Sequence, residues 1–150
     1  MAVTVVAALI ERDGRVLICQ RSRAGSFPLS WEFPGGKVEP GETLPAALAR
    51  ELQEELGVEC SVGVEQYRTK HSYREFPNAL ELVFFSADFA EPLPDLVLTP
   101  SEAFEQVIWE RVEALSNYDF LPADRELVAR LVSRAIAAAA RPPKNLSDAS

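Results

Sequence analysis

The sequence is poor in cysteine and histidine and has no long apolar run. Of its 150 residues only two are cysteine and one is histidine. Cys19 and Cys60 lack metal-ligand spacing and make a poor disulfide scaffold, so we expect reduced, buried thiols. No segment approaches the roughly 20 apolar residues that span a bilayer, and the first residues lack the features of a signal peptide. These absences argue against a membrane partner and predict a cytoplasmic protein.

Positive charge is also scarce. The chain has 15 Lys and Arg against 23 Asp and Glu, a formal net charge of -8. A protein that mainly neutralises the phosphates of long nucleic acid would be basic, so we expect no such partner. An acidic surface is still compatible with a nucleotide whose phosphates are bridged to it by divalent cations.

The composition is that of one globular domain, with 47% hydrophobic and 25% charged residues. A chain of this size buries about two-thirds of its unfolded surface, so a metal is not needed to hold the fold and would serve function. We expect one domain over residues 1–140 and a disordered tail over residues 141–150.

Hydrophobic periodicity predicts alternating strands and helices. An Asp13-Gly14 pair between apolar runs predicts a tight hairpin turn, and residues 75–78 are a second turn sequence. The proline-rich segment 91–100 is expected to be a loop that carries a ligand or forms a lid. The expected strands cover residues 3–10, 16–19, 60–73, 80–90 and 106–109, and the expected helices cover residues 45–56 and 122–140.

The first of these helices carries a cluster of acidic residues. Thr43 is a good N-cap and Gly57 a good left-handed C-cap. Glu51, Glu54 and Glu55 fall within roughly 100° of arc on the helical wheel. Carboxylates this close on one helix face repel one another, and binding of a hard divalent cation, Mg²⁺ or Mn²⁺, would offset the repulsion. A solvated helix face would also explain the three glutamates, so the helix alone leaves both interpretations open.

The loop before this helix favours the chemical interpretation. Gly35 and Gly36 permit close backbone approach, Lys37 adds a cation, and Gly41-Glu42 leads into the acidic helix. Loop and helix together predict a phosphate and metal site.

Residues 36–58, GKVEPGETLPAALARELQEELGV, fill every specified position of the Nudix box. The chain therefore resembles the Nudix hydrolases, and its opening hairpin, its WEFPGGK segment and the late Leu121-Pro122-Ala123-Asp124 are similar to the MutT-like branch. The resemblance covers roughly residues 3 to 135. It implies an α/β/α sandwich with a mixed, curved β-sheet between helices. It also implies Mg²⁺- or Mn²⁺-dependent hydrolysis of a nucleoside triphosphate to the monophosphate and pyrophosphate.

The resemblance implies a role for each charged residue of the box. Arg50 would orient the glutamates by pairing with one of them. Glu54 is the favoured general base, followed by Glu51. The other candidates are Glu102 and Glu105 in the later loop, for which a solvated position is equally expected. The implied metal ligands are Glu51, Glu54, Glu55 and the backbone carbonyl of Gly35.

Substrate recognition would come mainly from outside the box. Asp124 stands where the MutT type has an asparagine. An ionised aspartate only accepts hydrogen bonds, which suits the amino-bearing edge of cytosine or adenine. Burial could instead hold it protonated, or it could cap the last helix. The expected substrate-binding residues are Arg21, Phe33, Lys37, Phe84 (or Phe85) and Asp124.

Two alternatives remain open at this point. One is hydrolysis of another nucleoside diphosphate compound, such as ADP-ribose or a diadenosine polyphosphate. The other is a nucleotide-binding domain without catalysis, against which the complete set of box carboxylates argues. We expect a small-molecule nucleotide as partner and a monomer or homodimer as assembly, and His71 is expected to be structural or exposed.

Overall fold

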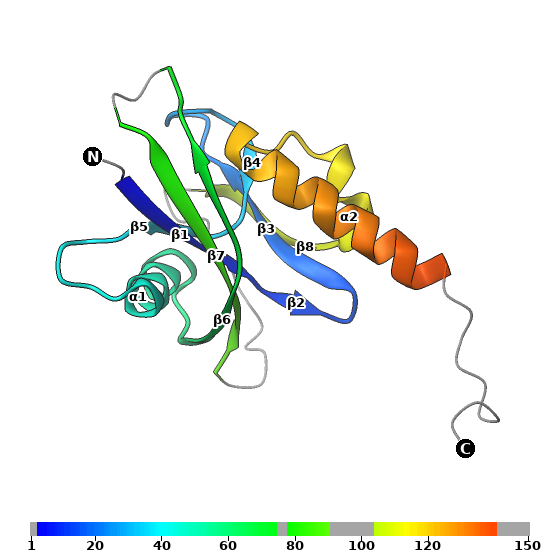
Figure 1. Ribbon diagram of the computed structural model, residues 1–150, viewed down its shortest axis with the longest axis horizontal. Coiled ribbons are helices and arrows are strands. Elements are labelled where there is room, and N and C mark those ends of the chain that lie inside the picture. The colour runs from blue at the N-terminus through cyan, green and yellow to red at the C-terminus, as the bar shows by residue number, and fades with distance from the viewer. Residues whose placement is uncertain (1–2, 75–77, 91–103, 141–150) are drawn as a thin grey trace.

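The computed structural model describes residues 3–74, 78–90 and 104–140. Figure 1 shows strands in the middle of the molecule and a helix on either side. The elements are β1 (Val3–Leu9), β2 (Glu11–Arg12), β3 (Arg15–Arg21), β4 (Trp31–Glu32), β5 (Gly35–Lys37), α1 (Leu44–Leu56), β6 (Cys60–His71), β7 (Leu80–Phe89), β8 (Phe104–Arg111), the 3₁₀ helices η1 (Val112–Asn117) and η2 (Pro122–Asp124), and α2 (Arg125–Ala140).

The strands form two four-stranded sheets. The first has the order β5-β1-β7-β6, in which β1 and β7 are parallel and the other pairs antiparallel. In the second sheet β3 pairs with β2, β4 and β8. The sequence predicted one curved mixed sheet. Two are present because the chain leaves the first sheet after Leu9 and pairs again as the short strand β2.

The predicted Asp13-Gly14 turn is confirmed, but it joins β2 to β3 and does not join β1 to β3. Both turn residues have positive φ, 53° and 76°, which is the backbone of the tight turn that matches strand twist. Ile10 is fully buried between the two sheets, and its carbonyl accepts from the Leu17 N–H at 3.0 Å.

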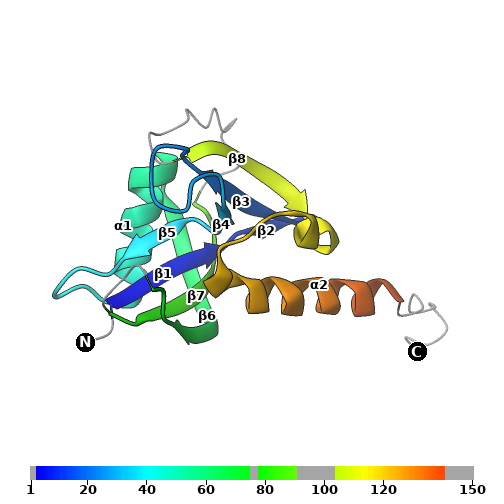
Figure 2. The ribbon, with the colours of Figure 1, turned by 90° about the horizontal axis from the view of Figure 1, so that it is seen from above.

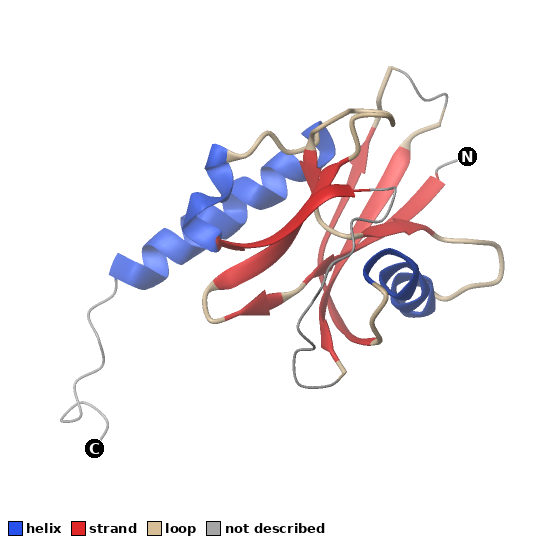
Figure 3. Ribbon diagram, turned by 180° about the vertical axis from the view of Figure 1, so that it is seen from behind, coloured by secondary structure: helices blue, strands red, loops and turns tan. Residues whose placement is uncertain are grey.

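Side chains of β1 alternate between two apolar cores. Val6 and Ala8 pack with the buried face of α1, whereas Ala7 and Leu9 pack with α2 and its neighbours. This period-two pattern places α1 and α2 on opposite sides of the strands, as Figures 2 and 3 show from two other directions. The predicted α/β/α sandwich is therefore confirmed.

Both helices begin and end close to the predicted residues. The Thr43 side chain accepts from the Ala46 N–H at 3.2 Å, and Gly57 closes α1 with φ 69°. The last helix differs at its start, because residues 122–124 form a 3₁₀ turn and α2 begins at Arg125. Neither helix combines the length and apolar character required to cross a bilayer.

The predicted antiparallel pair β6–β7 is also confirmed, and β8 is longer than predicted. Cys19 and Cys60 are free and buried, as expected. The predicted loop over residues 91–100 and the tail over residues 141–150 lie outside the described residues, as does most of the predicted turn over residues 75–78.

Candidate active site

A cavity of about 1260 Å³ opens beside α1 and β5 and extends to η2. Its walls come from widely separated parts of the chain, including β1, the loop after β3, α1 and the start of β8. Seven charged side chains line it: Arg21, Glu32, Lys37, Glu51, Glu55, Glu105 and Asp124.

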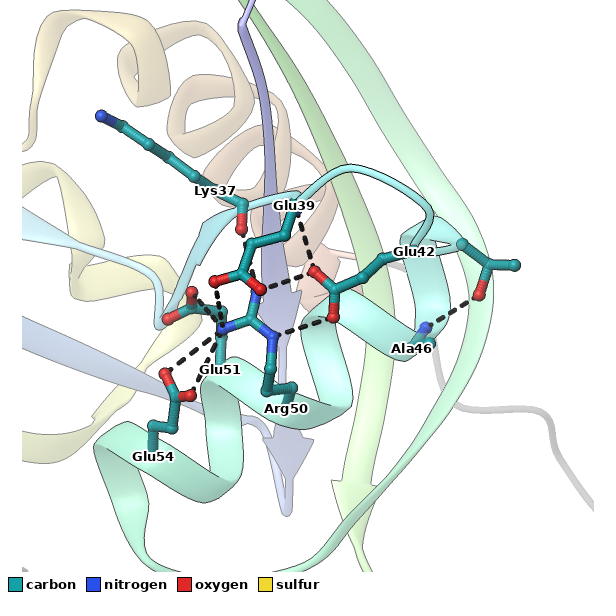
Figure 4. A network of polar contacts seen from close by, with 8 residues as sticks. Lys37, Glu39, Glu42, Ala46, Arg50, Glu51 and Glu54 are labelled. Carbon is teal, nitrogen blue, oxygen red and sulfur yellow. Dashed lines mark hydrogen bonds and ion pairs between the residues drawn. The ribbon is translucent and has the colours of Figure 1, made fainter.

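Arg50 is the centre of an ionic network on the exposed side of α1 (Figure 4). Its guanidinium donates two bonds to the Glu42 carboxylate, at 2.8 and 2.9 Å. It also donates to Glu51 at 2.9 Å and to the Lys37 carbonyl at 3.1 Å. A longer contact of 3.3 Å reaches Glu54. Arg50 therefore ties β5 and the loop that follows it to the acidic helix.

Glu42 had no predicted role of its own, and the structure supplies one. The Arg50 guanidinium holds the pKa of Glu42 at about 2, so this carboxylate stays ionised. A planar fork on a carboxylate fixes both groups in orientation. Glu42 thus positions Arg50, which in turn positions Glu51.

Gly36 allows Glu51 to reach the cavity. A Cβ atom at residue 36 would lie 2.3 Å from the Cδ atom of Glu51, so any side chain there would displace the carboxylate. At Gly35 the obstacle is backbone, because a Cβ would lie 2.0 Å from the Val6 carbonyl oxygen. Burial raises the pKa of Glu51, and its bond with Arg50 opposes that rise.

Glu55 lies deeper, beneath β5. Its Oε2 atom accepts from the Gly35 N–H at 3.1 Å. Burial, and next the charge of Glu32, raise the pKa of Glu55 to about 8. A cation close to a buried carboxyl stabilises its ionised form and so lowers the raised pKa.

These residues fit a hard divalent ion by their donor chemistry. Glu51, Glu55 and the Gly35 backbone converge on the cavity wall. Glu54 is 59% exposed and does not line the cavity, but it contacts the same Arg50 nitrogen as Glu51. No three acidic, histidine or cysteine side chains within the described part of the chain already form a cluster that could hold an ion. Carboxylate oxygens are the ligands that Mg²⁺ and Mn²⁺ prefer. Occupancy would require the glutamates to exchange part of their bonding to Arg50 and Gly35 for the ion.

The far end of the cavity is built from β4 and η2. The Trp31 N–H donates to the Asp119 carbonyl at 2.9 Å, and the Leu121 N–H donates to the Trp31 carbonyl at 3.0 Å. These backbone bonds bring Asp124 next to β4. Its side chain is 4% exposed, and Asp124 is the one buried charged residue in the part of the chain that the structure describes.

Asp124 does not cap α2. Among the described residues its carboxyl makes no hydrogen bond, and only its backbone N–H is bonded, to the Leu121 carbonyl at 2.9 Å. Burial, and next the charge of Glu32, raise the pKa of Asp124 well above its usual range. The side chain is therefore a carboxyl that favours its neutral form and faces the cavity.

Glu32 is a site residue that the sequence analysis missed. Its charge raises the pKa of both Asp124 and Glu55. Burial raises the pKa of Glu32 itself, although the Arg21 guanidinium bonds to it at 3.0 Å. A signal was present, since Trp31 and Phe33 are both core residues. Alternation along the chain turns the residue between them toward the opposite side.

The comparisons with known proteins agree with this geometry. The NUDIX domain family matches residues 1–131. The chain belongs to the NUDIX family. It is 38% identical over 127 residues to the CTP pyrophosphohydrolase of Escherichia coli K12, covering 84% of this chain and 88% of that protein. It is 30% identical over 130 residues to the nucleoside triphosphatase NudI of Klebsiella pneumoniae, covering 81% and 91%.

Solved structures give the same fold. The E. coli ORF135 protein in solution superimposes with a TM-score of 0.71 at 34% identity, over 95% of each chain. A MutT protein from Methanosarcina mazei Go1 has a TM-score of 0.74 at 24% identity, over 89% of this chain and 94% of that one. The predictions of a Nudix hydrolase and of its fold are confirmed.

Arg21 of this Nudix chain lines the cavity, and its hydrogen bonds go to protein groups. It donates to the Ser26 carbonyl at 2.8 Å, to the Ser26 Oγ at 2.9 Å and to Glu32. The loop it holds contains Phe27 and Leu29 with φ of 47° and 64°. In this arrangement Arg21 shapes the loop between β3 and β4.

The predicted aromatic wall is only partly present. Phe33 lines the cavity and stacks on Phe120, with ring centroids 5.3 Å apart. Phe84 is fully buried behind it, edge-on at 6.1 Å, and does not line the cavity. Phe85 packs in the core on the α1 side. Strand alternation in β7 turns both side chains into the cores, which corrects the expected contact of Phe84 with substrate.

The remaining predicted residues lie at or outside the rim of the cavity. Lys37 is exposed and lines it. Glu105 lines it as well and accepts from the Arg23 N–H at 3.2 Å. His71 packs against the Tyr73 ring at 4.3 Å, in keeping with a structural role. Glu102 lies outside the described residues.

Proposed function

We propose that this Nudix enzyme hydrolyses a nucleoside triphosphate to the monophosphate and pyrophosphate with the help of Mg²⁺ or Mn²⁺. One observation carries the proposal: a single cavity joins the carboxylates of Glu51 and Glu55 to the buried carboxyl of Asp124. The first end suits metal-bound phosphates, and the second suits a base. Similarity to a CTP pyrophosphohydrolase and to NudI supports a triphosphate substrate.

The chemistry required is attack of water on a phosphorus atom. A new P–O bond forms to water, the P–O bond to the leaving pyrophosphate breaks, and the water proton passes to a carboxylate. Divalent cations at Glu51, Glu54, Glu55 and the Gly35 carbonyl would neutralise the polyphosphate charge that repels the nucleophile. Glu54 is our proposed general base, with Glu51 second. Arg50 holds these glutamates in place, and Lys37 at the rim suits a phosphate contact.

Asp124 is the proposed base-reading residue. A neutral carboxylic acid presents one donor beside one acceptor, whereas a carboxylate presents acceptors only. Cytosine and adenine carry an amino donor next to a ring nitrogen acceptor, so a neutral Asp124 can bond both. We place cytosine first, because one relative is named for CTP. Removal of modified or surplus nucleotides is the role that such an activity would serve.

We place this activity in the cytoplasm, where nucleotides are used and where the two free cysteines stay reduced. For the assembly we expect a monomer or a homodimer.

The direct test is release of pyrophosphate from a panel of nucleoside triphosphates, normal, oxidised and methylated, at about 5 mM Mg²⁺, a level chosen for a weakly bound hydrated ion. ADP-ribose and a diadenosine polyphosphate complete the panel, with EDTA as the metal-free control. We expect pyrophosphate from cytosine triphosphates above the others. Hydrolysis of ADP-ribose alone, or no hydrolysis of any compound in the panel, would refute the triphosphate assignment.

A further inference from the structure

Tyr73 connects two walls of the cavity that are far apart in sequence. It follows β6 directly and lines the cavity. Its hydroxyl oxygen accepts a hydrogen bond from the Ala123 N–H at 3.0 Å. Ala123 is the middle residue of η2 and immediately precedes Asp124.

The η2 turn depends on this bond. The first N–H groups of a helical turn have no acceptor within the turn and need one from elsewhere. Leu121, at the N-cap position, provides no side-chain cap, and Pro122 has no N–H. Ala123 is only 6% exposed, so water gives its N–H little compensation. Tyr73 thus supplies the cap from fifty residues away.

The Tyr73 ring has a second set of contacts. It packs against Phe27, with centroids 5.0 Å apart and planes inclined at 54°, and Phe27 also lines the cavity. Phe27 lies in the loop that Arg21 holds through Ser26. One side chain therefore links the loop after β3 to the turn that carries Asp124.

We propose that Tyr73 is a positioning residue for base selection: its hydroxyl caps η2 and so fixes where the Asp124 carboxyl meets the base. The inference rests on the proposed function. A carboxylic acid can present its donor and acceptor in either order. Cytosine and uracil carry opposite orders at the same edge, and the proton can sit on either carboxyl oxygen, so selection between them depends on where the η2 backbone places the carboxyl against the base.

The Tyr73→Phe variant isolates the hydroxyl, because it keeps the ring packed on Phe27. We expect the ratio of kcat/KM for CTP over UTP to fall about tenfold, the size of effect that follows when a positioned hydrogen-bonding group is lost. The Mg²⁺ concentration for half-maximal rate should stay within about twofold, since Tyr73 is not part of the α1 network. Tyr73→Leu, which also removes the ring contact, should lower the ratio further and raise KM.

Tyr118→Phe is the matched control. The Tyr118 hydroxyl donates to Glu110, and its ring packs edge-on against Trp31 at 4.9 Å, without lining the cavity. The Tyr118→Phe variant also loses a phenolic hydroxyl, and it should keep the wild-type ratio of kcat/KM for CTP over UTP. A drop in Tm without a change in the ratio for Tyr73→Phe would show a merely structural hydroxyl and overturn the proposal.

A binding measurement separates this proposal from the proposed function. Calorimetric titration with CMP and UMP in EDTA needs neither hydrolysis nor metal. If the wild-type protein prefers CMP and Tyr73→Phe does not, the positioning role holds even where triphosphates are not cleaved. If the wild-type protein cleaves CTP selectively and Tyr73→Phe retains the selectivity in both assays, only the Tyr73 proposal fails. If wild type shows no base preference in either assay, base selection by Asp124 and positioning by Tyr73 both fail, whereas the triphosphate assignment is decided separately by pyrophosphate release.

Discussion

The two ends of the cavity use the same functional group in opposite ways. At the α1 end, carboxylates gather around Arg50, and their oxygens take part in ion pairs at 2.8 to 3.3 Å. At the η2 end, the Asp124 carboxyl is buried and no ion pair to it is present in the described residues. The α1 end comes from one short segment, whereas the η2 end joins β4, η2 and Tyr73.

Environment decides which form each carboxyl takes. The Arg50 guanidinium holds the pKa of Glu42 at about 2, whereas burial raises the pKa of Asp124 and also that of Glu55, the deepest carboxyl of the α1 end. Ionised groups can bind cations and accept a proton from water, while a neutral acid can donate to a base. On the proposed function, the two ends would separate phosphate chemistry from base recognition through the different environments of the same residue types.

The largest effect should come from the α1 end. Glu54→Gln removes one charge from the proposed metal site and the favoured general base, so we expect kcat to fall at least about 10²-fold with little change in Tm. Steady-state kinetics over a range of Mg²⁺ concentrations measures this. Glu59→Gln, an exposed position just after α1, is the matched control and should keep wild-type turnover. Near-normal turnover of Glu54→Gln would remove Glu54 from the mechanism.

A smaller effect of a different kind is expected at the η2 end. Asp124→Asn keeps the size of the side chain but fixes which atom donates and which accepts, so the ranking of bases should change by about tenfold. The dependence of the rate on Mg²⁺ concentration should stay as in the wild-type protein. The triphosphate panel repeated on the variant provides the measurement. An unchanged ranking would leave Asp124 without a role in base recognition and would blur the contrast between the two ends.

The smallest effect should appear in stability against pH. Burial raises the pKa of Glu55 to about 8, above the value of about 4.3 in an unfolded chain. The protonated Glu55 side chain therefore contributes to the free energy of unfolding fully at acid pH, and this contribution is lost as pH rises through about 8. In EDTA we expect Tm to fall by at least about 3 °C between pH 5 and pH 9. Mg²⁺ should reduce the fall, because it binds the ionised form.

Glu55→Gln is the control for this measurement. Because glutamine does not titrate, the variant should show a flatter Tm profile in EDTA and a smaller response to Mg²⁺. The same slope in the variant and the wild-type protein would assign the pH dependence to another group and leave Glu55 outside the metal site.

Local patterns predicted the α1 end well. The Thr43 cap, the Gly57 cap and the glutamate face of α1 depend on residues within one segment, and each lies where periodicity places it. The cap roles involve neighbours only a few residues away, so tertiary packing has little to change. The sequence predicted only that Gly36 allows another group to approach the backbone closely. It did not identify that group as the Glu51 carboxylate, because Glu51 lies on another element.

The η2 end was harder to predict, because its partners are distant in sequence. Nothing local indicates that Arg21 bonds Ser26 and Glu32, or that Phe84 faces the core. The division into two sheets has the same origin, since strand pairing depends on which register buries most apolar surface. Side-chain direction in β4 and β7 follows from that pairing, and with it the position of Glu32.

The backbone bonds of Trp31 to Asp119 and Leu121 have a consequence during synthesis. A ribosome releases the acidic helix long before it releases residues 119–124, because the chain emerges from its N-terminus. A nascent chain that ends before Asp119 therefore displays every carboxylate of the box and lacks the closing segment of the pocket. On the proposed function, discrimination between bases is therefore among the last properties that a growing copy of this protein would acquire.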